Sequence, residues 1–183
     1  MRRQISLIDI QSYYSRVLCP YVFRYTLEDN SVVTIIFRME NFCHLLGIHH
    51  IKNISDYKAI KGYTNIAKGN ITIESLKKTD KKEFQKIYPR LYAFNQLSSL
   101  LLRGKAFRFD RSKASSVIKA DFLLARENKD LHLHLFIVKS SLDSNVYAPM
   151  SFIPVAVKSK VAYKYTMNQE EKKIKYLEIY YKN

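Results

Sequence analysis

The chain has 183 residues, a formal net charge of +15 at pH 7 and two cysteines. A chain of this length forms one compact domain that buries about 70% of its unfolded surface. Cys19 and Cys43 are too few for a disulfide framework and lack the spacing of a zinc site, and no apolar run approaches the ~18 residues of a membrane span. We therefore expect one soluble, cytoplasmic domain over residues 1–183, without a metal, a cofactor or a membrane partner.

Lysine and arginine together number 31, against 16 acidic residues. This excess exceeds what solubility requires and favours binding to polyanions, to RNA first and to DNA as the alternative. The lysines are spread through the chain, as they also are in proteins encoded by AT-rich genomes. The charge therefore favours a nucleic-acid partner without locating its site.

The first elements in chain order are a helix and a hairpin. Residues 5–18 carry a helical apolar pattern that ends before Pro20. Residues 21–27 and 31–38 are rich in aromatic and β-branched residues and are separated by three polar residues. This pattern is typical of two strands joined by a short turn.

A short helix that carries a histidine is expected next. The apolar positions after Phe42 follow i, i+3, i+4 spacing, and Gly47 stands where a left-handed residue ends a helix. At 100° per residue, His44 lies about 160° from the centre of the apolar stripe and points away from the core. Such an imidazole suits acid–base chemistry near neutral pH, and the alternative is an ordinary surface histidine.

The central third predicts helices. Residues 55–60 and 72–77 favour two short helices in a weakly patterned stretch. Residues 84–101 then place apolar side chains at alternating steps of three and four, after an acidic capping pair. Pro89 predicts a kink or a restart of this helix, and Gly104 closes the pattern with a glycine cap.

The last part of the chain predicts strands separated by turn residues. We expect strands at residues 105–110, 120–126, 131–139, 150–158, 161–165 and 173–181, with a turn at 168–171. Helices that precede a run of antiparallel strands indicate the α+β class, with the helices packed on one sheet face.

Three short motifs appear within this order of elements: F-x-H-L-L-G at residues 42–47, A-D-F-L-L at 120–124 and P-M-S-F at 149–152. With the order of elements, they resemble the phage-associated group of the barnase, EndoU, colicin E5/D and RelE-like nuclease superfamily, over roughly residues 20–182. The resemblance implies a curved antiparallel sheet preceded by helices. It also implies a metal-independent ribonuclease site on the open sheet face.

Such a ribonuclease needs a base for the 2′-hydroxyl proton, cations for the charge on the phosphorane and an acid for the leaving oxygen. His44 matches the motif and is the acid–base candidate. Glu40 precedes it by one helical turn and is a candidate to fix its tautomer or raise its pKa. Ser151, in the third motif, is expected to donate a hydrogen bond to the phosphate, as the resemblance implies.

Arg108 is the candidate phosphate clamp, because it projects from a strand flanked by aromatic residues. The alternative is an exposed strand arginine. Arg103 and Lys105 lie close by in the sequence and are candidate substrate-binding residues. Strand alternation sends Lys105 and Arg108 to opposite sides, so only some of these cations can share one cleft.

The remaining candidates are histidines and one lysine. His132 and His134 alternate with leucines and share the face opposite to them, where we expect surface histidines; a contact with nucleic acid is favoured over metal binding. His49 and His50 come immediately after Gly47 and either line the same cleft as His44, where His49 is a candidate to bind substrate, or are ordinary loop residues. Lys52 is a further candidate to bind substrate.

Aromatic and basic residues are interleaved near the C-terminus, as in Tyr163, Lys164 and Tyr165. Such a pattern offers base stacking together with phosphate contacts, and packing against helices is the competing explanation. The leading hypothesis is a metal-independent endoribonuclease, of the toxin or mobile-element effector type, that cleaves RNA by acid–base transesterification. The alternatives are a non-catalytic nucleic-acid-binding module and a module that binds an acidic antitoxin or inhibitor protein.

Overall fold

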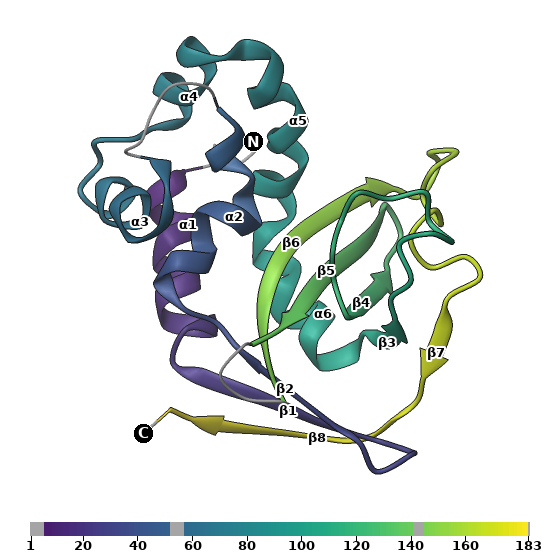
Figure 1. The fold of residues 1–183 in the computed structure, drawn as a ribbon. Helices are drawn as coiled ribbons and strands as arrows, with labels where there is room; N and C mark the ends of the chain where they lie inside the picture. The colour runs from purple at the N-terminus through teal and green to yellow at the C-terminus, as the bar shows by residue number, and fades with distance from the viewer. Residues whose placement is uncertain (1–5, 52–56, 141–144, 183) are drawn as a thin grey trace.

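The computed structural model describes residues 6–51, 57–140 and 145–182. Within them the fold is α+β, as predicted, with the helices gathered on one side of a curved sheet (Figure 1). None of the helices in this described part is long and apolar enough to cross a membrane.

The N-terminal helix and the hairpin are confirmed. Helix α1 (Leu7–Tyr13) begins where the Ser6 side chain accepts a hydrogen bond from the backbone N–H of Asp9, and it continues as a π-helical turn over Tyr14–Leu18. Strands β1 (Tyr21–Leu27) and β2 (Val32–Ile36) then pair antiparallel.

The short histidine helix is also confirmed. A 3-10 turn, η2 (Met39–Asn41), leads into α2 (Phe42–Leu46), whose apolar stripe is buried while His44 is exposed. Gly47 adopts the left-handed conformation with φ of 78° and ends the helix. A second 3-10 turn, η3 (Ile48–His50), follows at once.

The central helices differ from the prediction in their boundaries. They are α3 (Ala59–Ala67), α4 (Ile73–Thr79), α5 (Lys81–Ala93) and α6 (Leu97–Arg103). The first predicted short helix lies partly outside the described residues, and α3 begins only near its end.

The predicted long helix is broken later than expected. Pro89 lies inside α5, and the break is a 3-10 turn, η5 (Phe94–Gln96). The ring of Phe94 is fully buried and packs edge-on against the ring of Phe152, so tertiary packing sets the position of the break. Gly104 is extended, not left-handed; a Cβ there would lie 2.5 Å from the carbonyl oxygen of Leu100.

The described residues form an eight-stranded sheet in the order β7-β3-β4-β5-β6-β2-β1-β8. All its pairs are antiparallel except β2 with β6, which is parallel. The remaining strands are β3 (Lys105–Arg108), β4 (Phe122–Glu127), β5 (Leu131–Lys139), β6 (Val146–Ala156), β7 (Glu170–Lys172) and β8 (Ile174–Tyr181).

Two predictions near the C-terminus are wrong. Residues 161–165 form turns instead of a strand, and a short strand, β7, begins at Glu170 where a turn was expected. Strand β6 also begins earlier than predicted, at Val146, because its first residues pair with β2. The turn-forming segment, residues 157–169, is called the strap below, and it is the yellow-green loop beside β3 and β6 in Figure 1.

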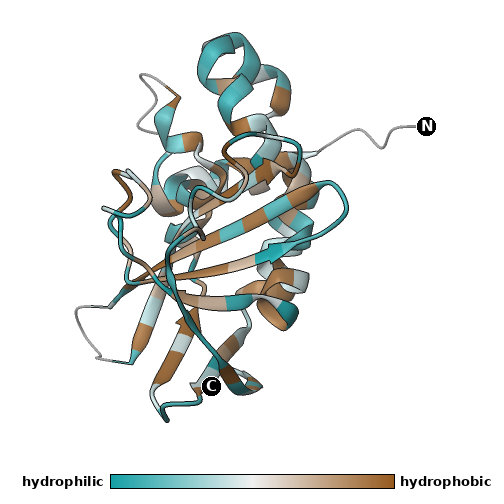
Figure 2. Ribbon diagram, turned by 90° about the vertical axis from the view of Figure 1, so that its right-hand side faces the viewer, coloured by the Kyte–Doolittle hydropathy of each residue, from teal (hydrophilic) through white to brown (hydrophobic). Residues whose placement is uncertain are grey.

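Both faces of the sheet are buried along β4 and β5. Polar and apolar residues alternate along the strands (Figure 2), and in β5 the side chains of Leu133 and Leu135 join the main core on the helix side. On this side the hydroxyl of Tyr25 donates a hydrogen bond of 2.8 Å to the carbonyl of Leu101. The opposite face carries a second core around Phe136 and Phe109, against which the strap packs.

Candidate functional site

A cleft of about 740 Å³ opens where α2, α5, β6 and the strap meet. His44, His49 and His50 line it from the segment after β2, Arg90 from α5, Ser151 from β6, and Lys164 and Tyr165 from the strap. The F-x-H-L-L-G and P-M-S-F motifs therefore meet in one site. Arg90 and Lys164 bring positive charge to this cleft, and no acidic residue is among the described residues that line it.

The three histidine rings stack on one another. The ring centroids of His44 and His49 are 4.0 Å apart, and those of His49 and His50 are 3.9 Å apart. This stack depends on Gly47, whose left-handed backbone turns η3 back toward α2. His49 Nδ1 lies 3.4 Å from the carbonyl oxygen of Cys43 and donates to it, which leaves Nε2 as the acceptor.

Partial desolvation lowers the pKa of all three imidazoles. It lowers the pKa of His44 and of His50, and the neighbouring charge of Arg90 lowers the pKa of His50 further. Burial, and next the charges that His44 and His50 can carry, lower the pKa of His49 to about 4. A neutral imidazole has a free lone pair, so this cluster is equipped to accept a proton.

Arg90 supplies a cation at the floor of the cleft. Its Nη1 donates toward Ser151 Oγ over 3.5 Å. A Cβ at Gly47 would lie 3.0 Å from Arg90 Nη1 and 2.9 Å from Ile87 Cγ2, so the glycine leaves the space that the guanidinium occupies. Burial lowers the pKa of Arg90, but a guanidinium stays protonated in proteins.

The three cations predicted from the sequence do not line this cleft. The Arg108 guanidinium lies over the Phe122 ring, 5.1 Å from its centre, and Lys105 Nζ pairs with Glu171 Oε2 at 3.1 Å. Arg103 is exposed at the end of α6. Strands β4 and β5 separate β3 from β6, which places these residues away from Ser151.

Glu40 is also outside the cleft. Neither a hydrogen bond nor an ion pair joins it to His44 in the described part of the chain, and burial alone shifts the pKa of His44. The Glu40 charge acts instead on Tyr14, whose pKa burial raises first and Glu40 raises further. Lys52, the other candidate near the histidines, lies outside the described residues.

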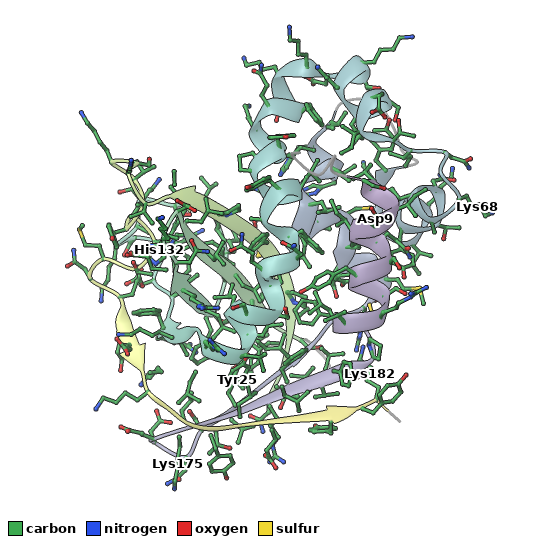
Figure 3. The ribbon with its side chains drawn as sticks, turned by 180° about the vertical axis from the view of Figure 1, so that it is seen from behind. Asp9, Tyr25, Lys68, His132, Lys175 and Lys182 are labelled. Atoms are coloured by element: carbon green, nitrogen blue, oxygen red, sulfur yellow. The ribbon has the colours of Figure 1, made fainter. Side chains whose placement is uncertain are left out.

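His132 and His134 are buried, so the expectation of surface histidines is wrong. Their side chains do point away from the leucines, as predicted, but the strap covers that face: Tyr163 packs on His132 and Tyr165 on His134, at 5.1 and 5.2 Å between ring centroids. His134 Nδ1 donates a hydrogen bond of 2.9 Å to the carbonyl of Ile153. Figure 3 labels His132 on the strands near the strap.

No group of three or more histidine, cysteine, aspartate or glutamate side chains in the described segments is arranged to hold a metal ion. His49 and His50 line the cleft beside His44, as one of the two alternatives expected. Arg90 and Tyr165 are cleft residues that the sequence analysis did not select for this site. Arg90 follows Ile87 by three residues and so borders the buried stripe of α5. This spacing is the sequence feature that could have pointed to Arg90. Tyr165 belongs to the predicted aromatic and basic run, but its segment was expected to be a strand.

A family model described as phage-Barnase-EndoU-ColicinE5/D-RelE like nuclease 4 matches residues 6–183. This segment spans nearly the whole chain and contains every residue that lines the cleft. Comparison with curated proteins and with solved structures gave no significant match.

Proposed function

The chain belongs to the phage-Barnase-EndoU-ColicinE5/D-RelE like nuclease 4 family, and we propose that it is an endoribonuclease that cleaves RNA without a metal ion. The observation that carries the proposal is the convergence of imidazoles with lowered pKa values, a partly buried guanidinium and a serine hydroxyl in one cleft. These are the groups that transesterification of RNA requires.

In the proposed mechanism His44 acts as the base. Its neutral ring removes the proton of a ribose 2′-hydroxyl, the 2′-oxygen forms a bond to phosphorus, and the bond from phosphorus to the 5′-oxygen breaks. Because the charges that His44 and His50 can carry lower the proton affinity of His49, the stacked cluster favours holding a single proton. It can therefore return that proton to the leaving 5′-oxygen, and the products are a 2′,3′-cyclic phosphate and a 5′-hydroxyl.

Arg90 and Ser151 are placed to bind the phosphate. The guanidinium offers fixed positive charge where the phosphorane gains negative charge, and its burial strengthens that interaction. The Ser151 hydroxyl, 3.5 Å from Arg90 Nη1, can donate a hydrogen bond to the same phosphoryl group.

The net charge of +15 supports RNA as the substrate, and DNA is the second polyanion to test. The biological role proposed is that of a toxin or mobile-element effector in the cytoplasm, held inactive by an acidic antitoxin or inhibitor that covers the positive cleft. A non-catalytic RNA-binding module is the alternative function, because the same positive cleft would bind RNA without cleaving it.

The test is cleavage of single-stranded RNA in EDTA, with detection of the 2′,3′-cyclic phosphate end. The variants His44→Ala and Arg90→Ala are expected to lower the rate by about 10²- to 10⁴-fold. Arg108→Ala is the matched control, because this arginine lies outside the cleft, and it should cut at the parental rate. Salt-dependent RNA binding without turnover from pH 5 to pH 9 would instead identify the binding module.

A further inference from the structure

We propose that one wall of the cleft is a nucleobase-binding subsite, which holds one unpaired base through Tyr165 and Val117. This inference rests on the proposed RNA substrate and states which part of the RNA, besides the phosphate, the protein contacts. Polar and apolar side chains both line the cleft. The polar ones include the histidines, Arg90 and Ser151, and the apolar ones come from the loop before β4 and from β6, with the aromatic ring of Tyr165 from the strap.

Tyr165 contributes an aromatic ring that neighbouring side chains hold in place. The ring packs edge-on against His134 and Phe136, with centroids 5.2 and 5.1 Å apart and interplanar angles of 71° and 85°. Both neighbours are fully buried in β5, so the ring loses little further freedom when a base stacks on it. Lys164 Nζ lies over the Tyr165 ring, 5.6 Å from its centre. This side chain is exposed, so it can turn to a phosphate when a base stacks on the ring.

Val117 lies at the rim and is 92% exposed, although its loop is anchored. Ala114 is buried in the second core, and the backbone N–H of Ser116 donates to the carbonyl of Arg111 at 3.0 Å. Ser115 adopts a left-handed φ of 44°, a costly conformation for a residue other than glycine. An anchored, strained loop that holds an apolar side chain at the rim of a cleft is suited to contact a ligand.

The size of the cleft suits one nucleotide. Sites for small ligands have volumes of about 300 to 1,000 Å³, and this cleft, at about 740 Å³, falls inside that range. A base in a duplex is paired and stacked between its neighbours, so it cannot reach a ring inside such a cleft. The subsite therefore selects single-stranded RNA, in which a base can turn outward beside the phosphate.

The experiment measures binding of two fluorescent 2′-fluoro tetranucleotides, one with its bases and one abasic, by anisotropy. The 2′-fluorine prevents cleavage, and both probes carry the same charge. We expect the parent to bind the base-containing probe about 5- to 100-fold more tightly than the abasic probe. Val117→Ser and Tyr165→Leu should each shrink that ratio, while Val161→Ser, a similar change at a residue 52% exposed on the strap, should leave it unchanged.

Equal affinity of the parent for the two probes, or a ratio that both cleft variants retain, would overturn the subsite. Cleavage of natural RNA is scored separately. If RNA is cut in EDTA but the ratio is one, the subsite fails and the proposed function stands. If the ratio is large but RNA is never cut, the function fails and the subsite stands. A smaller ratio in Val117→Ser cannot be explained by misfolding, because the Val117 side chain is almost fully exposed and its loss leaves the core unchanged.

Discussion

His134 is expected to make the stability of this protein depend on pH. Its side chain is fully buried in β5, Nδ1 donates to the carbonyl of Ile153, and Nε2 has no partner among the described residues. A proton on Nε2 would place a charge in the second core. Burial, and next the charge that His132 can carry, therefore lower the pKa of His134 from 6.5 to about 3.

The direction in which stability changes with pH follows from comparing the protonation of His134 in the folded and unfolded states. Above pH 6.5 the imidazole is neutral in both states, and this contribution to stability is fully present. Below pH 6.5 the unfolded chain binds a proton that the folded protein does not, so stability falls until the folded pKa of about 3 is reached. At pH 5 the loss is about 1.5 pH units at 1.36 kcal/mol each, or roughly 2 kcal/mol.

The assay is urea unfolding, followed by circular dichroism, at pH 7.5 and pH 5 for the parent and for His134→Asn. The asparagine amide keeps a donor near Ile153 and does not titrate. Between the two pH values the parent should lose roughly 2 kcal/mol more unfolding free energy than the variant, while contributions from other groups cancel in the difference. The same pH dependence in both proteins would refute the reasoning.

Three further predictions concern the core and the cleft. Tyr25→Phe should lower the unfolding free energy by about 1–3 kcal/mol in urea titrations, because it leaves the buried carbonyl of Leu101 unpaired; an unchanged midpoint would contradict this. Gly47→Ala should destabilise more than Gly69→Ala in the same titrations, since both glycines are left-handed but only a Cβ at Gly47 meets Ile87 and Arg90 closer than normal contact. RNA cleavage should level off at a pH below 6.5 and fall about tenfold per unit on the acid side, because burial lowers the pKa of His44; a rate that still rises tenfold per unit above pH 7 would point to a different base.

Local patterns predicted most of the elements. The hairpin, α2 with its glycine end and strands β4, β5 and β8 follow from periodicity and turn residues that act over a few positions. The break at Phe94 does not, because Phe94 packs against Phe152, which is distant in the sequence. Likewise, the aromatic pattern of residues 161–165 resembles a strand, although the backbone turns there and Tyr165 packs against the second core.

The candidate site was predictable in part for the same reason. His44 and Ser151 carry motif signals of their own, and the structure brings them to one cleft. The choice of cation required the order of the strands: alternation places Arg108 on a face of β3, but only the sheet order shows that two strands separate β3 from β6.

The cation that reaches the cleft comes from a helix, and a glycine makes room for it. Gly47 ends α2 and turns His49 and His50 toward His44. The Arg90 guanidinium lies where a side chain at Gly47 would project. One residue thus assembles both the proton acceptors and the positive charge. For this reason the comparison of Gly47→Ala with Gly69→Ala tests the site as well as the fold: the two alanines carry the same backbone cost, and only the first should displace Arg90 and slow RNA cleavage.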